Sequence, residues 1–131
     1  MRSDHIRASL RVWHPTMPAQ AIYQSIKLKL VRQWSYGEPR TTPKGNALEG
    51  THTETYCCFE LDQSHSQELP STLRLANEEL SHSAELIKEI ANSGGRIEYY
   101  ITLSGGMGFE LDSALVSELS ALNASLAVEV L

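Results

Sequence analysis

The segment from Thr51 to Leu61 constrains the fold most, because its pattern predicts one long strand with two different faces. It is rich in β-branched and aromatic residues, and its side chains alternate between two sets. One set holds Thr53, Thr55, Cys57, Phe59 and Leu61, and the other holds His52, Glu54, Tyr56, Cys58 and Glu60. We expect the first set to face a hydrophobic core, so the chain has to build a sheet.

Further strands and helices follow in a regular order. We expect strands over Ala8–His14, Val31–Tyr36, Arg96–Leu103 and Ser125–Leu131. We expect helices over Ala19–Ile26, within Ser71–Ser93 with a candidate break near Ser81, and after the N-cap Asp112. Gly37–Gly50 reads as a loop and Asp62–Pro70 as a turn. The order β-α-β-β-α-β-α-β predicts one α+β domain over residues 1–131, with a ferredoxin-like split β-α-β core and an extra C-terminal α-β unit.

Periodicity also predicts which side chains are buried. On the first strand, Leu10 and Val12 should face the core, whereas Arg11 and Trp13 should face the other way. The long helical segment carries a helical stripe that we expect to be buried, made of Leu80, Ala84, Ile87 and Ala91. The last strand should point three side chains inward, namely Leu126, Val128 and Val130. Asn123 suits a left-handed helix end.

Charge is spread unevenly along the 131 residues, whose formal net charge is -5. Residues 1–44 carry eight Lys/Arg and two Asp/Glu, a balance of +6. Residues 45–131 carry three and fourteen, a balance of -11. Non-specific nucleic-acid binding usually rests on a basic surface, which the chain as a whole does not offer. We therefore expect no nucleic-acid partner, although a local basic patch from the first third stays open.

The chain shows no targeting or redox signal. No apolar run approaches the ~20 residues of a membrane span, and no apolar segment follows the polar N-terminus as in a signal peptide. We expect no membrane partner and a cytoplasmic location. Cys57 and Cys58 are neighbours in a strand, so they point to opposite faces and are poorly placed to bridge each other. They do not form a CxxC motif, and we expect no metal and no cofactor.

One loop and the strand after it carry a family resemblance. The loop reads Trp34-Ser35-Tyr36-Gly37-Glu38-Pro39-Arg40-Thr41-Thr42-Pro43-Lys44-Gly45, and the strand begins Thr51-His52-Thr53-Glu54-Thr55-Tyr56-Cys57-Cys58-Phe59. Together they resemble a family of small bacterial proteins known as domain of unknown function 4279. The family's members often carry Trp where this chain has Cys57. The resemblance spans nearly the whole chain and supplies no activity, substrate or catalytic residue.

The loop from Gly37 to Gly50 is the first candidate functional segment, because long loops in small domains are often functional. Arg40 and Lys44 could bind a carboxylate or phosphate, and threonine hydroxyls could add donors. The candidate ligand-binding residues are Trp34, Glu38, Arg40, Thr42 and Lys44. A structural loop and a protein-partner site remain open beside the small-anion site. The order of residues is not that of a P-loop.

A second candidate surface lies around the first strand. If helices cover only the Leu10 face, Trp13 points to an open sheet face and marks a partner surface with His14, His52 and Glu54. A loop such as Gly37–Gly50 could equally cover Trp13. A three-ligand metal site of His14, His52 and Glu54 is the less favoured interpretation, because exposed polar strand positions explain these residues. No catalytic residue is assigned, since no nucleophile–base set is apparent.

These observations favour a non-enzymatic binding or interaction module of a bacterial cytoplasm, for example an immunity-type protein that masks a toxin. The alternative is a small enzyme or sensor that binds an anionic metabolite through the 37–50 loop. A possible homodimer through an open sheet edge, at the last strand or at Val31–Tyr36, is a third option. A concave pocket at Arg40 and Lys44 would favour the ligand, and a flat aromatic surface would favour the partner.

Overall fold

A five-stranded mixed sheet organises the chain, with strand order β2-β5-β1-β6-β7. The computed structural model describes residues 5–61 and 68–131, so most of the turn expected over Asp62–Pro70 lies outside the described residues. The strands are β1 (Ile6–His14), β2 (Lys29–Trp34), β5 (Thr55–Glu60), β6 (Arg96–Leu103) and β7 (Ala124–Val130). Neighbouring strands are antiparallel except for β6 and β7, which are parallel. The mixed α+β architecture is the one that the sequence predicted.

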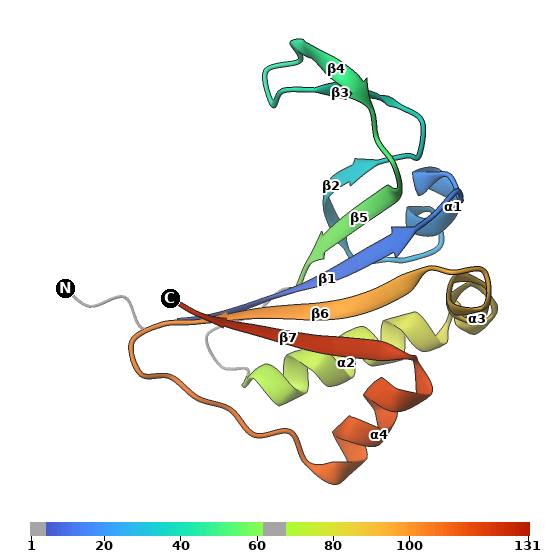
Figure 1. Cartoon of the computed structure of the whole chain (residues 1–131). Coiled ribbons are helices and arrows are strands. Elements are labelled where there is room, and N and C mark those ends of the chain that lie inside the picture. The colour runs from blue at the N-terminus through green and yellow to red at the C-terminus, as the bar shows by residue number, and fades with distance from the viewer. Residues whose placement is uncertain (1–4, 62–67) are drawn as a thin grey trace.

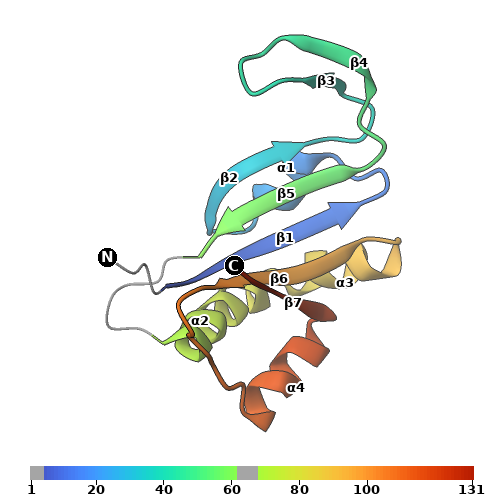
Figure 2. The same cartoon turned by 60° about the vertical axis from the view of Figure 1, so that its left-hand side comes forward.

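Four helices supply the other half of the core, namely α1 (Ala19–Tyr23), α2 (Leu69–Ser81), α3 (Ala84–Asn92) and α4 (Ser113–Ala121). Alternate side chains of β1, β5 and β6 are buried, among them Leu10, Phe59 and Tyr99. Each helix contributes buried apolar side chains to the same core, for example Ile22, Leu73, Ile90 and Leu115. In both Figure 1 and Figure 2, α2 and α4 lie together on one side of β6 and β7. One face of the sheet is therefore covered, and the other is open.

The segment predicted as an irregular loop, Gly37–Gly50, instead contains a hairpin of β3 (Pro39–Thr41) and β4 (Ala47–Thr51). Its turn is closed by backbone hydrogen bonds from Thr42 to Asn46 and from Gly45 to Thr42, both 2.8 Å. Gly45 has φ of 87°, a conformation that costs glycine little. The hairpin projects beyond the ends of β2 and β5 (Figure 1). Every residue of β3 and β4 is exposed, so no apolar alternation was there to reveal them.

The hairpin also shortens the strand predicted over Thr51–Leu61. Thr51 ends β4, and β5 begins only at Thr55. The predicted core set is confirmed from Thr55 to Leu61, whereas Thr53 is exposed. The predicted helix Ala19–Ile26 ends three residues early at Tyr23, and the strand predicted over Val31–Tyr36 lies at Lys29–Trp34.

The predicted helix break, N-cap and helix end are confirmed, whereas the predicted burial of helix residues is confirmed only in part. The break near Ser81 is confirmed, and it separates α2 from α3. The predicted stripe is confirmed at Leu80 and Ile87, whereas Ala84 after the break is exposed and Ala91 is half-buried. Asp112 caps α4 by accepting a hydrogen bond from the Leu115 amide at 2.9 Å. Asn123 has φ of 56°, the left-handed conformation expected there.

The last strand has the predicted orientation, because Leu126 and Val128 lie beside the core residues Tyr99 and Ile101 of β6, but the burial expected there is wrong. Leu126, Val128 and Val130 of β7 are all exposed, and Val130 keeps 76% of its surface. Their alternation is real, but β7 is an edge strand and α4 does not extend over its outer half. An edge position cannot be read from the pattern of a single strand.

Candidate functional site

The open face of the sheet is the strongest candidate site. We use "open face" for the side chains of the five strands that point away from the helices. Register places Arg7, Arg11, Trp13, Lys29, Arg32, Trp34, Tyr56, Cys58, Glu60, Arg96, Glu98, Tyr100 and Glu129 on it. Among these described residues five are basic and three acidic, a balance of +2. The open face is therefore positive on a chain whose net charge is -5.

Aromatic rings run across the open face from strand to strand. The Trp13 and Tyr56 ring centroids are 5.4 Å apart with planes tilted by 41°. The Tyr56 and Trp34 centroids are 4.8 Å apart at 38°. His52, just after the hairpin, stacks on Trp34 at 4.5 Å and 12°. These separations fall in the range of attractive aromatic pairs, so the four rings form one connected row.

Guanidinium groups lie on the same rings. The Arg96 guanidinium carbon is 3.7 Å from the Trp13 ring centroid, and that of Arg11 is 4.2 Å from the Tyr100 centroid. Both are cation–π geometries. Arg11 also donates from Nε to Glu98 at 2.9 Å, an ion pair between two half-buried side chains. The ion pair fixes Arg11 in the middle of the face.

A shallow hollow of about 230 Å³ opens among these groups, lined by Arg11, Trp13, Arg32, Trp34 and Tyr56. It is smaller than the roughly 300–1,000 Å³ of sites that enclose a whole small molecule. Burial and, after it, the Cys58 thiol nearby raise the pKa of Tyr56 to about 12, although the positive charges of Arg11 and Arg32 oppose the shift. The phenol therefore stays protonated and can donate a hydrogen bond. Three aromatic rings and two guanidinium groups suit a planar ring beside a negative charge.

The residues predicted to bind an anion do not converge. Trp34 belongs to the open face, whereas Glu38, Arg40 and Lys44 are exposed on the hairpin. Arg40 donates to the Glu49 carbonyl oxygen at 3.3 Å across the hairpin. Thr42 accepts from the Asn46 amide through its hydroxyl at 3.1 Å, which closes the turn. Arg40 belongs to β3 of the hairpin, which projects beyond the ends of β2 and β5 in Figure 1. Three hollows among the described residues, of about 230, 450 and 490 Å³, are lined by residues other than Arg40 and Lys44.

The residues predicted around Trp13 divide between two faces. Trp13 points to the open face, as expected, and His52 reaches it by stacking on Trp34. Glu54 is exposed in the short connection between β4 and β5. His14 follows Trp13 in β1 and so points into the core, where it keeps only 3% of its surface. Within residues 5–61 and 68–131, no three His, Cys, Asp or Glu side chains gather to hold a metal ion.

His14 and Ser93 resemble a catalytic pair but cannot act as one. The amides of Thr16 and Met17 donate to His14 Nδ1 at 3.0 and 2.8 Å. The neutral ring therefore carries its proton on Nε2, which lies 2.7 Å from Ser93 Oγ and donates to it. Ser93 in turn donates to the Glu89 carbonyl. A ring that donates to the serine cannot accept its proton, so this contact is structural.

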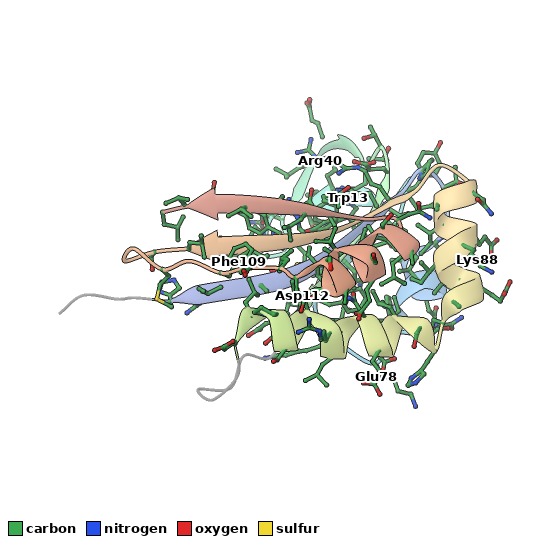
Figure 3. The ribbon with its side chains drawn as sticks, turned by 90° about the horizontal axis from the view of Figure 1, so that it is seen from below. Trp13, Arg40, Glu78, Lys88, Phe109 and Asp112 are labelled. Atoms are coloured by element: carbon green, nitrogen blue, oxygen red, sulfur yellow. The ribbon has the colours of Figure 1, made fainter. Side chains whose placement is uncertain are left out.

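A second hollow lies in the helical layer. It has a volume of about 450 Å³ between α2 and α4 and is lined by Arg74, Asn77, Glu78, Ser81, Glu118, Ala121 and Leu122. The buried Tyr99 hydroxyl donates to Asn77 Oδ1 at 2.6 Å, and Asn77 Nδ2 donates to Glu118 at 2.9 Å. Residues 69–92 and 104–121 hold two basic and seven acidic side chains, a balance of -5. Glu78 and Lys88 project outward from α2 and α3, away from Trp13 (Figure 3).

Sequence reasoning named Trp13 and Trp34 but missed Arg32, Arg96 and Tyr100 as site residues. The sequence did indicate that Arg96 and Tyr100 face away from the core, because they alternate with the apolar positions of β6. Only the order of the strands brings them beside Trp13. Arg32 was hidden by a bulge between Leu30 and Arg32, which shifts the alternation of β2 by one residue.

Comparison with known proteins identifies no relative of this chain. The chain matches no protein-family model, no curated protein and no solved structure. Within the described part of the chain, no helix is both long and apolar enough to cross a membrane.

Proposed function

We propose that this chain is a non-enzymatic binding module of a bacterial cytoplasm, and that it binds its partner through the open face of the sheet. The observation that carries the proposal is the row of Trp13, Tyr56 and Trp34 with Arg11 and Arg96 lying on its rings. Trp, Tyr and Arg are the residues in which binding energy concentrates at interfaces. A flat aromatic surface, rather than a pocket at Arg40 and Lys44, is the arrangement that favours a partner.

The strand order supports a ferredoxin-like interpretation of the core. Taken in chain order, the first, second, third and fourth sheet strands are β1, β2, β5 and β6, and they lie side by side as β2-β5-β1-β6. Helices enter after β1 and after β5, as in a split β-α-β arrangement. On this interpretation α4 and β7 are the C-terminal addition. The resemblance to domain of unknown function 4279 rests on the segment from Trp34 to Gly45 and on the strand segment from Thr51 to Phe59.

Photo-crosslinking from three positions tests which surface is used. A benzophenone maleimide is attached to Cys58 on the open face, since Cys57 is fully buried. Matched proteins carry Cys58→Ser with either Leu75→Cys on α2, where Leu75 is 53% exposed, or Lys44→Cys on the hairpin. Each is irradiated in a soluble extract of the source cells. We expect a discrete product from position 58 that Trp34→Ala abolishes.

The other outcomes each point elsewhere. A product from position 44 alone would return the site to the hairpin and to the anionic-metabolite alternative. A product from position 75 alone would place the partner on the acidic helical layer, the surface that an immunity-type protein would offer to a basic toxin. No product at any position would refute a binding role for the open face.

A second candidate function is self-association through the edge of β7. The exposed apolar side chains Leu126, Val128 and Val130 favour it, because a bare edge strand can pair with a second copy. Sedimentation equilibrium of the wild type and of Val128→Lys tests it, with Val116→Lys on α4 as the matched control. Val128 and Val116 are similarly exposed, at 45% and 50%. A monomer at all concentrations, or a dimer that survives Val128→Lys, would exclude this edge.

A further inference from the structure

We infer that the partner of the open face is single-stranded nucleic acid, with one base seated in the hollow between Trp13 and Trp34. The inference rests on the proposed function and names the chemistry of the partner. It replaces the expectation of no nucleic-acid partner, which came from the charge of the whole chain. Three properties of the open face lead to it: the placement of the rings, the free guanidinium groups and the separation of charge between the two sides.

The rings form a platform for stacking. Trp34, Tyr56 and Trp13 come from three adjacent strands, β2, β5 and β1, so they follow one another across the sheet. Their planes are tilted by 38° and 41°, so these three rings do not cover one another's faces completely, although His52 stacks on Trp34. Proteins that bind single strands stack successive bases on aromatic side chains of this kind, and a sheet surface is one recurrent support for them.

Basic side chains without a carboxylate partner lie on the same face of the sheet as the platform. Each of the three acidic residues of the open face is already engaged. Glu60 lies 3.5 Å from Lys29, Glu98 pairs with Arg11, and Glu129 accepts from the Tyr100 hydroxyl. By contrast, Arg7, Arg32 and Arg96 form no ion pair with another described residue, and all three are exposed. Free guanidinium groups beside stacked rings match the phosphates that accompany bases.

Charge separation orients a polyanion. The open face carries +2, whereas the helical segments 69–92 and 104–121 carry -5. A negatively charged nucleic-acid chain is therefore repelled from the helical layer and attracted to the sheet. The negative net charge of the whole chain argued against nucleic acid. The acidic residues of the helical layer, however, lie on the side that the nucleic acid would not contact.

The shape of the face favours a single strand over a duplex. The hollow of about 230 Å³ is walled by Trp13, Trp34 and Tyr56 with Arg11 and Arg32, and it can receive one splayed base. A duplex keeps its bases stacked inside and would use only the arginines. An acidic peptide would also satisfy the arginines, but it has no series of planar rings to occupy the row of aromatics. The test includes such a peptide.

Fluorescence anisotropy with defined oligonucleotides tests the inference on the purified chain. The probes are fluorescein-labelled oligo(U) and oligo(dT) of about 12 nucleotides, a length typical of single-strand sites. The same oligo(dT) annealed to its complement is the duplex, and a labelled Glu-rich peptide is the protein-like probe. Both tryptophans of the chain lie on the open face, so quenching of their fluorescence reports binding there. We expect at least one single strand to bind tenfold or more tightly than the duplex.

Variants separate stacking from charge. Trp34→Ala should weaken single-strand binding about fivefold or more, the lower end for loss of one stacked base. With three free guanidinium groups, the slope of log K against log salt should be about -2, and Arg32→Ala should reduce it by about 0.7. Lys88→Ala, an exposed cation on α3, is the matched control and should change neither quantity.

Clear results would overturn the inference. No binding of either single strand up to about 0.1 mM, the weak limit of non-specific binding, refutes it. Equal or tighter binding of the duplex, or affinity unchanged in both Trp34→Ala and Arg32→Ala, refutes it as well. If the Glu-rich peptide binds and the oligonucleotides do not, the partner is a protein. The crosslink from Cys58 would then persist but resist nuclease, so the open face keeps its binding role while the nucleic-acid assignment falls.

Discussion

His14 offers the sharpest test of how the core supports the open face, because one buried ring joins three segments. Its Nδ1 accepts from the Thr16 and Met17 amides, which turns the chain from β1 toward α1. Its Nε2 reaches Ser93 at 2.7 Å, which ties the end of α3 to the same point. Replacing His14 by Ala leaves two amide donors and a hydroxyl without this partner. Since each lost partner of a half-buried group costs about 1 kcal/mol or more, we expect a loss of about 2–4 kcal/mol in the free energy of unfolding.

His14→Asn is the matched variant. An asparagine Oδ1 lies close to where Nδ1 lies and accepts from amides two and three residues ahead, as in an Asx turn. It keeps the turn but loses the contact to Ser93, so the loss should be about 1 kcal/mol smaller than for His14→Ala. Urea unfolding followed by circular dichroism measures both. Equal destabilisation by the two variants would contradict the role given to Nδ1.

The pH dependence of the same group follows from its protonation. Burial holds the pKa of His14 below its ordinary value of 6.5, although the nearby Glu89 carboxylate opposes this. A protonated ring can no longer accept from Thr16 and Met17. The folded pKa is the lower one, so the contribution of His14 to stability is complete above pH 6.5. It is lost as the pH falls from 6.5 through the folded pKa. Wild type should lose more stability than His14→Asn between pH 7.5 and pH 5, and equal losses would refute the assignment.

Three further outcomes are expected. Gly95→Ala places a Cβ within 2.7 Å of a main-chain carbonyl oxygen in β1, so it should lower the free energy of unfolding by about 1–3 kcal/mol in urea titration. Burial raises the pKa of Cys57 to about 12, so one thiol, Cys58, should react with a disulfide reagent at pH 8 and Cys57 only after denaturation. Tyr99→Phe removes the hydroxyl that donates to Asn77, so it should cost about 1–3 kcal/mol in thermal or urea unfolding.

Local signals predicted the elements whose structure depends on their own residues. The strand Arg96–Leu103 has the predicted bounds, because both of its faces follow one alternation and Gly94 and Gly95 precede it. The cap at Asp112 and the left-handed Asn123 were equally local. The hairpin from Pro39 to Thr51 was missed because every residue of β3 and β4 is exposed, so no apolar period marks its strands. Its strands are held by backbone hydrogen bonds, which every residue can accept and every residue except proline can donate.

Properties that depend on the order of the strands in the sheet could not be predicted from the sequence. The predicted inward face of β7 has the right period, but whether Val128 is covered depends on where α4 ends, not on β7. The residues predicted to bind a ligand do not converge for a related reason. Arg40 and Lys44 are neighbours along the chain, and they were grouped for that reason. Trp13, Trp34 and Arg96 are far apart in the sequence, and they meet only because β1 lies between β5 and β6.

The charge asymmetry seen along the sequence becomes an asymmetry between two sides of the molecule for a topological reason. The basic first third contains β1 and β2, which supply Arg7, Arg11, Lys29 and Arg32 to the open face. The acidic remainder supplies α2, α3 and α4, which cover the other face. A helix that packs on a sheet exposes its own polar side to solvent, so the acidic residues of these helices collect opposite the arginines. The net charge of -5 therefore averages over the whole chain, while the open face carries +2, and a partner that meets this face responds to its charge alone.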